Sequence, residues 1–362
     1  MLLCTNNYTE GRDPMSADTK YQRIANELRE KIQNKEFKLS EKLPSEYQLT
    51  AQYGVSRQTV RDALEVLQEQ RLIERIQGKG SFVINHNPIT KIPTFNVGVI
   101  VPELTNTSMF PVMLRSITDV LQVNGYSTLF AETKDRFDVE RHVLQNMLDK
   151  QVDGIILGGT KCILPSPNLS CFAALTEAGI PYTFIHTRPS EFPEAVHVSM
   201  DNQQGGWLIT NYLIRHGYRK IGCALKLHSI QGIARYQGFQ KAMSEAGLFV
   251  SDDSVLWFSC AADLRTYSHE KLRGVSECEA VVCFNDYTAA LLTSRLQEMG
   301  CRVHDDICIT GFDGTDPNNF FVSPQPENGW PEVGAVAAQT LLKQIRGEKV
   351  SPTIFRWIIP AD

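Results

Sequence analysis

Apolar residues near the start of the chain recur at the spacing of a helix face. Tyr21, Ile24, Leu28 and Ile32 fall on one stripe, which predicts a first helix. The preceding residues, 1–18, are polar, contain Gly and Pro, and show no apolar period. We therefore expect them to form a disordered leader.

Two more helices and a hairpin are expected before the pattern changes. Ser45 and Gln48 fit a capping box, which marks the start of the second helix. Ser56 is a favourable N-cap for a third helix. Two short apolar runs, 72–76 and 81–84, then flank a glycine-containing turn, and this arrangement predicts a β-hairpin. Residues 19–84 are thus expected to form one small domain.

After a linker at 85–95, which contains two prolines, strand-like and helical patterns alternate. The expected strands are 97–101, 128–131, 154–157, 182–185, 221–225, 281–284 and 307–312. Helical patterns lie between them at 111–124, 139–149, 202–216, 232–246 and 287–299. Such alternation predicts an α/β fold of parallel sheets flanked by helices. The number of segments favours two lobes within 96–362, with ligands at the carboxyl ends of the strands.

Composition narrows the class of protein. With 42% hydrophobic and 21% charged residues, the 362-residue chain is typical of a globular protein. No apolar run approaches the roughly 18 residues of a membrane-spanning helix, and the start lacks a secretion signal, so we expect a cytoplasmic protein with no membrane partner. Nine cysteines, without any Cys-x-x-Cys pair, favour reduced thiols. Neither a metal site nor a cofactor is expected.

Charge is distributed unevenly along the chain. Residues 15–84 hold 12 Lys and Arg against 10 Asp and Glu, a balance of +2. Because the net charge of the whole chain is −5, the remaining residues sum to −7. A mildly basic amino-terminal part on an acidic body suits a protein that binds DNA through its smaller domain.

The third helix offers a surface that can read DNA. Arg57 and Arg61 lie four residues apart, on the opposite side from the apolar face, where a recognition helix needs donors for guanine edges or phosphates. A solvated basic face is the alternative for an isolated helix. Here the helix follows a capped helix and a short turn and precedes the hairpin, and this combination favours DNA binding.

These segments resemble the winged helix-turn-helix of GntR-family regulators. The resemblance covers residues 20–84 and rests on the runs at 43–46, 54–64 and 78–83. It implies DNA contacts from the recognition helix and its neighbouring turns. The residues implied are Ser45, Ser56, Arg57, Gln58, Thr59, Arg61, Gln77, Gly78 and Lys79. Tyr47 departs from the arginine of several relatives, and Arg71 from a common glycine, where a positive φ would cost roughly 1 kcal/mol.

Polar residues at strand ends indicate a sugar site in the larger domain. A sugar needs carboxylates, amides and guanidinium groups for its hydroxyls, and an aromatic face for its C–H side. Arg235 follows a strand closely, as do Asn285, Asp286 and Asp313. Each has a plainer alternative: the aspartates could cap helices or turns, and Arg235 could be a surface residue. The candidate aromatic platforms are Phe110, which could instead belong to the core, and Trp330.

The larger domain resembles the LacI-type, periplasmic-binding-protein-like sugar domain. The resemblance rests on the runs at 97–102, 152–156, 201–206, 235–239, 284–286 and 311–313. A GntR-like head on a LacI-like body also occurs in the arabinose repressors, which the runs at 160–161, 167–168 and 231–239 resemble. The implied ligand residues are Phe110, Lys161, Arg235, Asn285, Asp286, Asp313 and Asn328. Lys161 could alternatively be a solvated loop residue, and His186 stands where the family often has Asp.

The expected function is a sugar-responsive repressor that binds operator DNA as a homodimer and is released by L-arabinose. Another pentose or a hexose is the alternative effector. An enzyme is the rival class, but the chain lacks Gly-x-Gly-x-x-Gly after its first strand, a phosphate-binding Gly-x4-Gly-Lys motif and His-Glu-x-x-His. No catalytic residues are therefore assigned. A transported-sugar binder would have a signal peptide and no helix-turn-helix.

Overall fold

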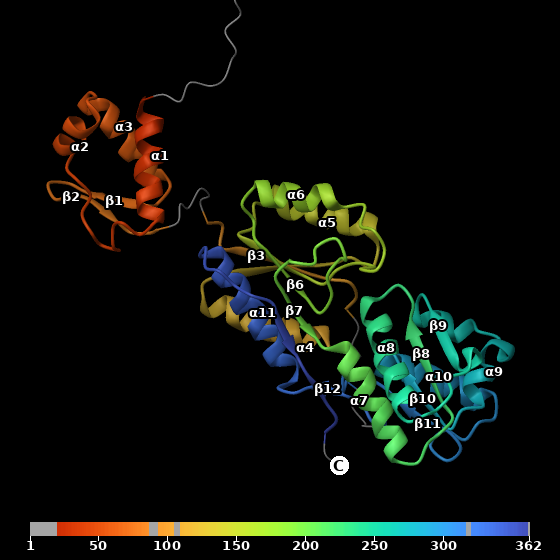
Figure 1. The fold of residues 1–362 in the computed structure, drawn as a ribbon. Coiled ribbons are helices and arrows are strands. Elements are labelled where there is room, and N and C mark those ends of the chain that lie inside the picture. The colour runs from red at the N-terminus through yellow and green to blue at the C-terminus, as the bar shows by residue number, and fades with distance from the viewer. Residues whose placement is uncertain (1–19, 87–92, 105–108, 316–319, 361–362) are drawn as a thin grey trace, which may run out of the picture. The chain divides into compact units, whose positions relative to one another are not determined.

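The computed structural model describes residues 20–86, 93–104, 109–315 and 320–360 (Figure 1). The expected leader, 1–18, and most of the expected linker lie outside these residues. Contacts divide the chain into two compact units, Met1–Ile92 and Pro93–Asp362. Among the described residues, no helix combines the length and apolarity needed to cross a bilayer.

The first unit contains the expected three helices and hairpin. The helices are α1 (Lys20–Gln33), α2 (Glu46–Tyr53) and α3 (Arg57–Glu69), and the antiparallel strands are β1 (Ile73–Ile76) and β2 (Gly80–Val83). Their apolar faces enclose one small core, in which Leu28, Leu49, Leu64 and Leu67 are fully buried. The capping box at Ser45 and Gln48 is formed as the sequence predicts, and Ser56 caps α3.

The first lobe of the second unit is built on a six-stranded parallel sheet of order β13-β7-β6-β5-β3-β4. Its strands are β3 (Asn96–Val101), β4 (Ser127–Glu132), β5 (Gly154–Leu157), β6 (Tyr182–Ile185), β7 (His197–Met200) and β13 (Thr353–Phe355). One face is covered by α4 (Phe110–Val123) and α11 (Gly329–Ile345), the other by α5 (Phe137–Asp149) and α6 (Leu169–Glu177). Successive strand residues therefore alternate between two cores: Val99 faces α4 and Ile100 faces α5.

The second lobe repeats this plan on a four-stranded parallel sheet of order β11-β10-β8-β9. Its strands are β8 (Ile221–Lys226), β9 (Val255–Phe258), β10 (Ala280–Cys283) and β11 (Cys308–Thr310). Helices α7 (Asn202–Arg215) and α8 (Ile230–Glu245) cover one face, and α9 (His269–Ser276) and α10 (Asp286–Glu298) the other. The expected two-lobed fold is confirmed.

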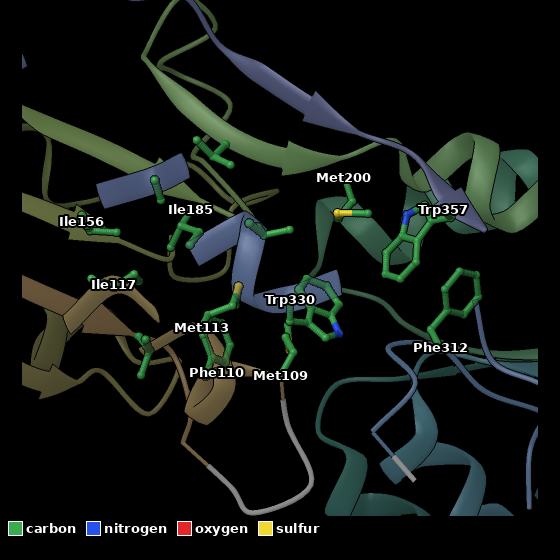
Figure 2. Close-up of a cluster of buried hydrophobic side chains, with 14 of the residues drawn as sticks. Met109, Phe110, Met113, Ile117, Ile156, Ile185, Met200, Phe312, Trp330 and Trp357 are labelled. Atoms are coloured by element: carbon green, nitrogen blue, oxygen red, sulfur yellow. The ribbon is translucent and has the colours of Figure 1, made fainter. Parts of the chain in front are cut away.

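The chain passes between the lobes more than once. Strand β7 of the first lobe leads directly into α7 of the second, and the chain later returns through β12 (Gln325–Pro326) to α11. Strand β13 then leads into β14 (Trp357–Ile358), which pairs with β12. Figure 2 shows the aromatic cluster beside these crossings. In it, Trp357 packs edge-on against Trp330 and Phe312, with ring centroids 5.7 and 5.3 Å apart.

Candidate functional site

The exposed side of α3 presents two arginines in the first turns of the helix. Ser56 ends the preceding turn and accepts a hydrogen bond from the Thr59 backbone N–H, which fixes where α3 begins. Arg57 and Arg61 follow with 69% and 45% of their side chains exposed. Another expected DNA contact on α3, Gln58, donates to Asp62 at 2.7 Å.

One carboxylate holds both arginines. Glu46 accepts from Arg57 Nε at 2.8 Å and Arg61 Nε at 3.1 Å, and its other oxygen accepts from Arg75 at 2.9 Å. Although partial burial raises the pKa of Glu46, the hydrogen bonds from Arg57 and Arg61 bring it below its ordinary value. Glu46 thus holds Arg57, Arg61 and Arg75 together. The sequence analysis missed Glu46 and Arg75 because α2 and the hairpin meet α3 only in the folded unit.

The hairpin tip is exposed and contains a left-handed residue. Gly78 has φ of 77° and open space where a Cβ would lie, while Gln77 and Lys79 beside it are exposed. Tyr47 is also exposed, at 83%, and lies one residue after Glu46. Arg71, at the position where a glycine is common in the family, has a positive φ of 51°.

A pocket lies between the lobes of the second unit, and residues of both lobes line it. Its walls are the segments that follow β3, β4, β5 and β6 in one lobe and β8, β10 and β11 in the other. The carboxyl ends of both sheets therefore meet at this pocket, as expected for such folds. Of the predicted ligand residues, those lining it are Phe110, Lys161, Arg235, Asn285 and Asp313.

Arg235 and Asp313 form the polar floor of the pocket. Both side chains are almost fully buried, and Arg235 Nη2 lies 3.6 Å from Asp313 Oδ1. Arg235 also donates to Asn202 Oδ1 at 3.1 Å and to the Phe284 carbonyl. Its guanidinium carbon lies 4.0 Å from the centroid of the Phe312 ring. Burial lowers the pKa of Arg235 to about 10 and raises the pKa of Asp313 to about 7.

Close helix packing places Arg235. Helices α7 and α8 approach until their backbones touch: a Cβ added at Gly206 would lie 2.1 Å from the Arg235 carbonyl oxygen. A Cβ at Gly238 would lie 2.0 Å from the Gln203 carbonyl oxygen. Only glycine fits at these two contacts. The glycine runs that carried the family resemblance are thus the residues that set the depth of Arg235.

Buried polar atoms without partners surround this floor. His186 Nδ1 and Gln231 Nε2 have no hydrogen-bond partner among the described residues, and Asp313 Oδ1 has only its 3.6 Å ion pair with Arg235; all three residues line the pocket. Burial and the nearby Arg235 charge lower the pKa of His186 to about 3, so its ring is neutral at ordinary pH. Buried donors and acceptors without hydrogen-bond partners are costly unless a polar ligand satisfies them. Their mixture suits hydroxyl groups, which both donate and accept.

Two predicted ligand residues lie elsewhere. Asp286 does not line the pocket; its carboxylate accepts from the Thr315 backbone N–H at 2.6 Å and from the Ser323 hydroxyl. Asp286 is the first residue of α10, and its carboxylate holds the segment that follows β11. Asn328 is exposed at the start of α11, also outside the lining. Neither residue is therefore among those that line this pocket.

The two aromatic candidates divide in the same way. Phe110 lines the pocket and meets the His186 ring edge-on, with centroids 5.9 Å apart. Trp330 belongs to the buried cluster of Figure 2 and donates from Nε1 to the Asp313 carbonyl at 2.6 Å. It supports Asp313 and does not line the pocket.

Several lining residues were absent from the sequence prediction. The main ones are Asp135, His186, Lys226 and Gln231. His186 and Lys226 each stand at the end of a correctly predicted strand, so the strand-end rule would have found them. Asp135 belongs to a turn after β4, and nothing in its local sequence distinguishes it from a solvated aspartate.

Comparison with protein families agrees with the division into two units. Residues 20–83 match the model described as "Bacterial regulatory proteins, gntR family". Residues 94–362 match the one described as "Periplasmic binding proteins and sugar binding domain of LacI family".

Among characterised proteins, the chain is 30% identical to the arabinose metabolism transcriptional repressor of Geobacillus stearothermophilus over 352 residues, 93% of this chain and 95% of the relative. It is 27% identical to the HTH-type transcriptional repressor PurR of Aliivibrio salmonicida, covering 72% and 78% of the two chains.

Solved structures share the fold. A CelR–cellobiose complex matches with a TM-score of 0.65 at 20% identity, covering 88% of this chain and 99% of that one. A periplasmic binding protein/LacI transcriptional regulator from Alkaliphilus metalliredigens, complexed with D-xylulofuranose, matches with a TM-score of 0.64 at 19% identity, covering 74% and 98%.

Proposed function

The chain belongs to the family of bacterial regulators that join a GntR-type DNA-binding head to a LacI-type sugar-binding domain, and we propose from this premise that it is a transcriptional repressor whose effector is a monosaccharide. The observation that carries the effector proposal is the group of buried polar atoms without hydrogen-bond partners, His186 Nδ1, Gln231 Nε2 and Asp313 Oδ1, in the pocket that Arg235 also lines. These groups complement the hydroxyls of a small sugar.

L-Arabinose is the effector that we propose first, because the relative that covers almost the whole chain is named for arabinose metabolism. Phe110 supplies an apolar wall, while Lys161, Asn285 and Asp313 join Arg235 as proposed hydrogen-bonding partners. Another pentose or a hexose would meet the same groups in a different arrangement. The repressed genes then concern carbohydrate use.

On DNA, we propose that α3 enters a major groove and that the hairpin tip approaches the adjacent phosphates. The proposed contacts are those of the family resemblance, from Ser45 to Lys79, with Arg57 and Arg61 at the centre. A single recognition helix reads too few base pairs to be specific in a genome, so we propose a homodimer on a roughly palindromic operator. Sedimentation at micromolar concentration should show a dimer; a monomer that binds DNA one-to-one would contradict it.

Calorimetric titration with L-arabinose, D-xylose, D-ribose and D-glucose tests the effector. We expect L-arabinose to bind, and a DNA fragment selected by the protein from a random library to be released when it does. If another sugar binds and releases the DNA, only the identity of the effector is wrong. If no sugar binds, or if bound sugar leaves operator affinity unchanged, the sugar-responsive function is wrong.

A further inference from the structure

A charged pair bridges the two lobes where they face each other across the pocket. Lys226 ends β8 in the second lobe, and Asp135 follows β4 in the first. Lys226 Nζ lies 2.9 Å from Asp135 Oδ2, and 23% of each side chain is exposed. Both residues line the pocket. The contact therefore forms only while the lobes are close together.

The same aspartate organises the first-lobe side of the opening. Its second oxygen, Oδ1, accepts from the Lys161 backbone N–H at 3.0 Å. Lys134, Asp135 and Lys161 all have left-handed backbones, with φ of 53°, 52° and 40°. A left-handed backbone is strained for such residues and persists only when the surroundings hold it there. Two of them, Asp135 and Lys161, line the pocket, so this strain lies at its edge.

We propose that Asp135 and Lys226 form an inter-lobe latch, a positioning pair that stabilises the closed arrangement of the lobes and thereby increases affinity for the bound sugar. The inference rests on the proposed sugar-binding function. A ligand that binds only the closed arrangement has an apparent affinity proportional to the fraction of closed protein. Breaking the pair lowers that fraction without removing a group from the pocket floor.

The test compares Lys226→Gln, Asp135→Asn, their double variant and Lys226→Arg in the full chain. Calorimetry with L-arabinose should show affinity reduced about 3- to 10-fold by each neutral single variant, as for a partly exposed ion pair. The double variant should be no worse than either single one, because both remove one interaction. Lys226→Arg, which keeps the charge, should retain affinity within about twofold of wild type. Lys220→Gln is the matched control, since Lys220 pairs with Glu277 at 3.4 Å on the exposed surface.

A second readout needs no sugar. Cys162 lines the pocket, is 3% exposed, and has its pKa raised to about 12 by burial. The thiolate is the form that reacts with iodoacetamide, and burial disfavours the thiolate. Opening the lobes should expose Cys162 to water and therefore accelerate the alkylation of Cys162. Lys226→Gln should raise the rate at Cys162 severalfold in sugar-free protein, measured by peptide mass spectrometry. Cys223, buried within the second lobe, serves as the internal reference and should not change.

The outcomes separate the latch from the sugar function. Unchanged sugar affinity and an unchanged Cys162 rate in Lys226→Gln would overturn the latch while leaving the repressor proposal intact. Additive losses in the double variant, without faster Cys162 alkylation, would also overturn it, since the two residues would then be contacting the ligand separately. If the wild type binds none of the sugars, the proposed function fails, and the Cys162 rates still decide whether the pair closes the lobes.

Discussion

Arg235 interacts with protein and pocket at the same time. Its donors reach Asn202, the Phe284 carbonyl and Asp313, and its plane lies against Phe312, yet it still lines the cavity. Asp286, by contrast, uses its carboxylate to hold Thr315 and Ser323. In the sequence, both residues were predicted to bind the ligand on the same grounds, because each is charged and follows a strand. The direction of each side chain, which depends on tertiary packing, distinguishes them.

This difference gives a prediction for two variants. Arg235→Lys keeps the charge but loses the planar fork and its stacking, so sugar affinity should fall at least about tenfold. Asp286→Asn should lower the free energy of unfolding by roughly 1–3 kcal/mol, because a buried charged hydrogen-bond set is broken, with a smaller loss of sugar affinity. Calorimetry and denaturant unfolding measure the two effects. Equal losses of sugar affinity in both variants would return Asp286 to the pocket.

His186 gives a prediction about pH. In the folded protein its pKa is lowered to about 3, whereas an unfolded histidine titrates near pH 6.5. Between these values the unfolded state binds a proton that the folded state does not, so this contribution to stability is present above pH 6.5 and is lost as pH falls. Relative to pH 7.5, the wild type should lose about 2 kcal/mol more than His186→Gln at pH 5.

Urea unfolding of both proteins across this pH range measures the difference, and the subtraction removes every titrating group that the two share. Parallel stability curves for wild type and His186→Gln would show that His186 takes up its proton in the folded state.

At the scale of elements, the sequence pattern located most of the helices and strands but not those beside the crossings between the lobes. The strands β5 and β6 match the predicted ranges to the residue, since short apolar runs buried on both faces stand out. Helix α11 was missed because Gly329 and Pro331 near its start resemble a turn, although proline is tolerated in the first helical turn. The short β7 and β13 were also missed. They are strands because the sheet pairs them, and the inter-lobe crossings depend on them.

The contact between α7 and α8 can be tested at the element scale. Gly238→Ala should push the helices apart, lowering stability by roughly 1–3 kcal/mol and moving Arg235 away from the pocket floor. Sugar affinity should then fall by more than tenfold. Gly274→Ala is the matched control, because Gly274 lies in α9, away from the pocket lining. Its added Cβ would lie 1.7 Å from the Asp253 carbonyl oxygen. It should destabilise the second lobe similarly while sugar affinity persists. Equal sugar affinities for the two variants would separate helix packing from the site.

For the whole molecule, the proposed function requires that sugar and operator influence each other through the complete chain. Thermodynamic reciprocity fixes the relation: if saturating sugar weakens operator affinity by some factor, saturating operator must weaken sugar affinity equally. A typical coupling of roughly 1–3 kcal/mol corresponds to about 5- to 150-fold. We expect this reciprocal weakening in the wild type when both titrations are run at one salt concentration.

Arg57→Ala separates the two binding events. Arg57 is largely exposed, and within the described part of the chain its ion pair is with Glu46, so its loss should leave the fold and the DNA-free sugar affinity unchanged. Operator affinity should fall, and if Arg57 meets a phosphate, the slope of log affinity against log salt should decrease by about one. Arg302→Ala is the matched control, an arginine 72% exposed in the second lobe and paired with Asp306. It should change neither operator affinity nor its salt slope. Equal effects of the two substitutions would remove α3 from the DNA interface, since loss of any surface cation would then suffice.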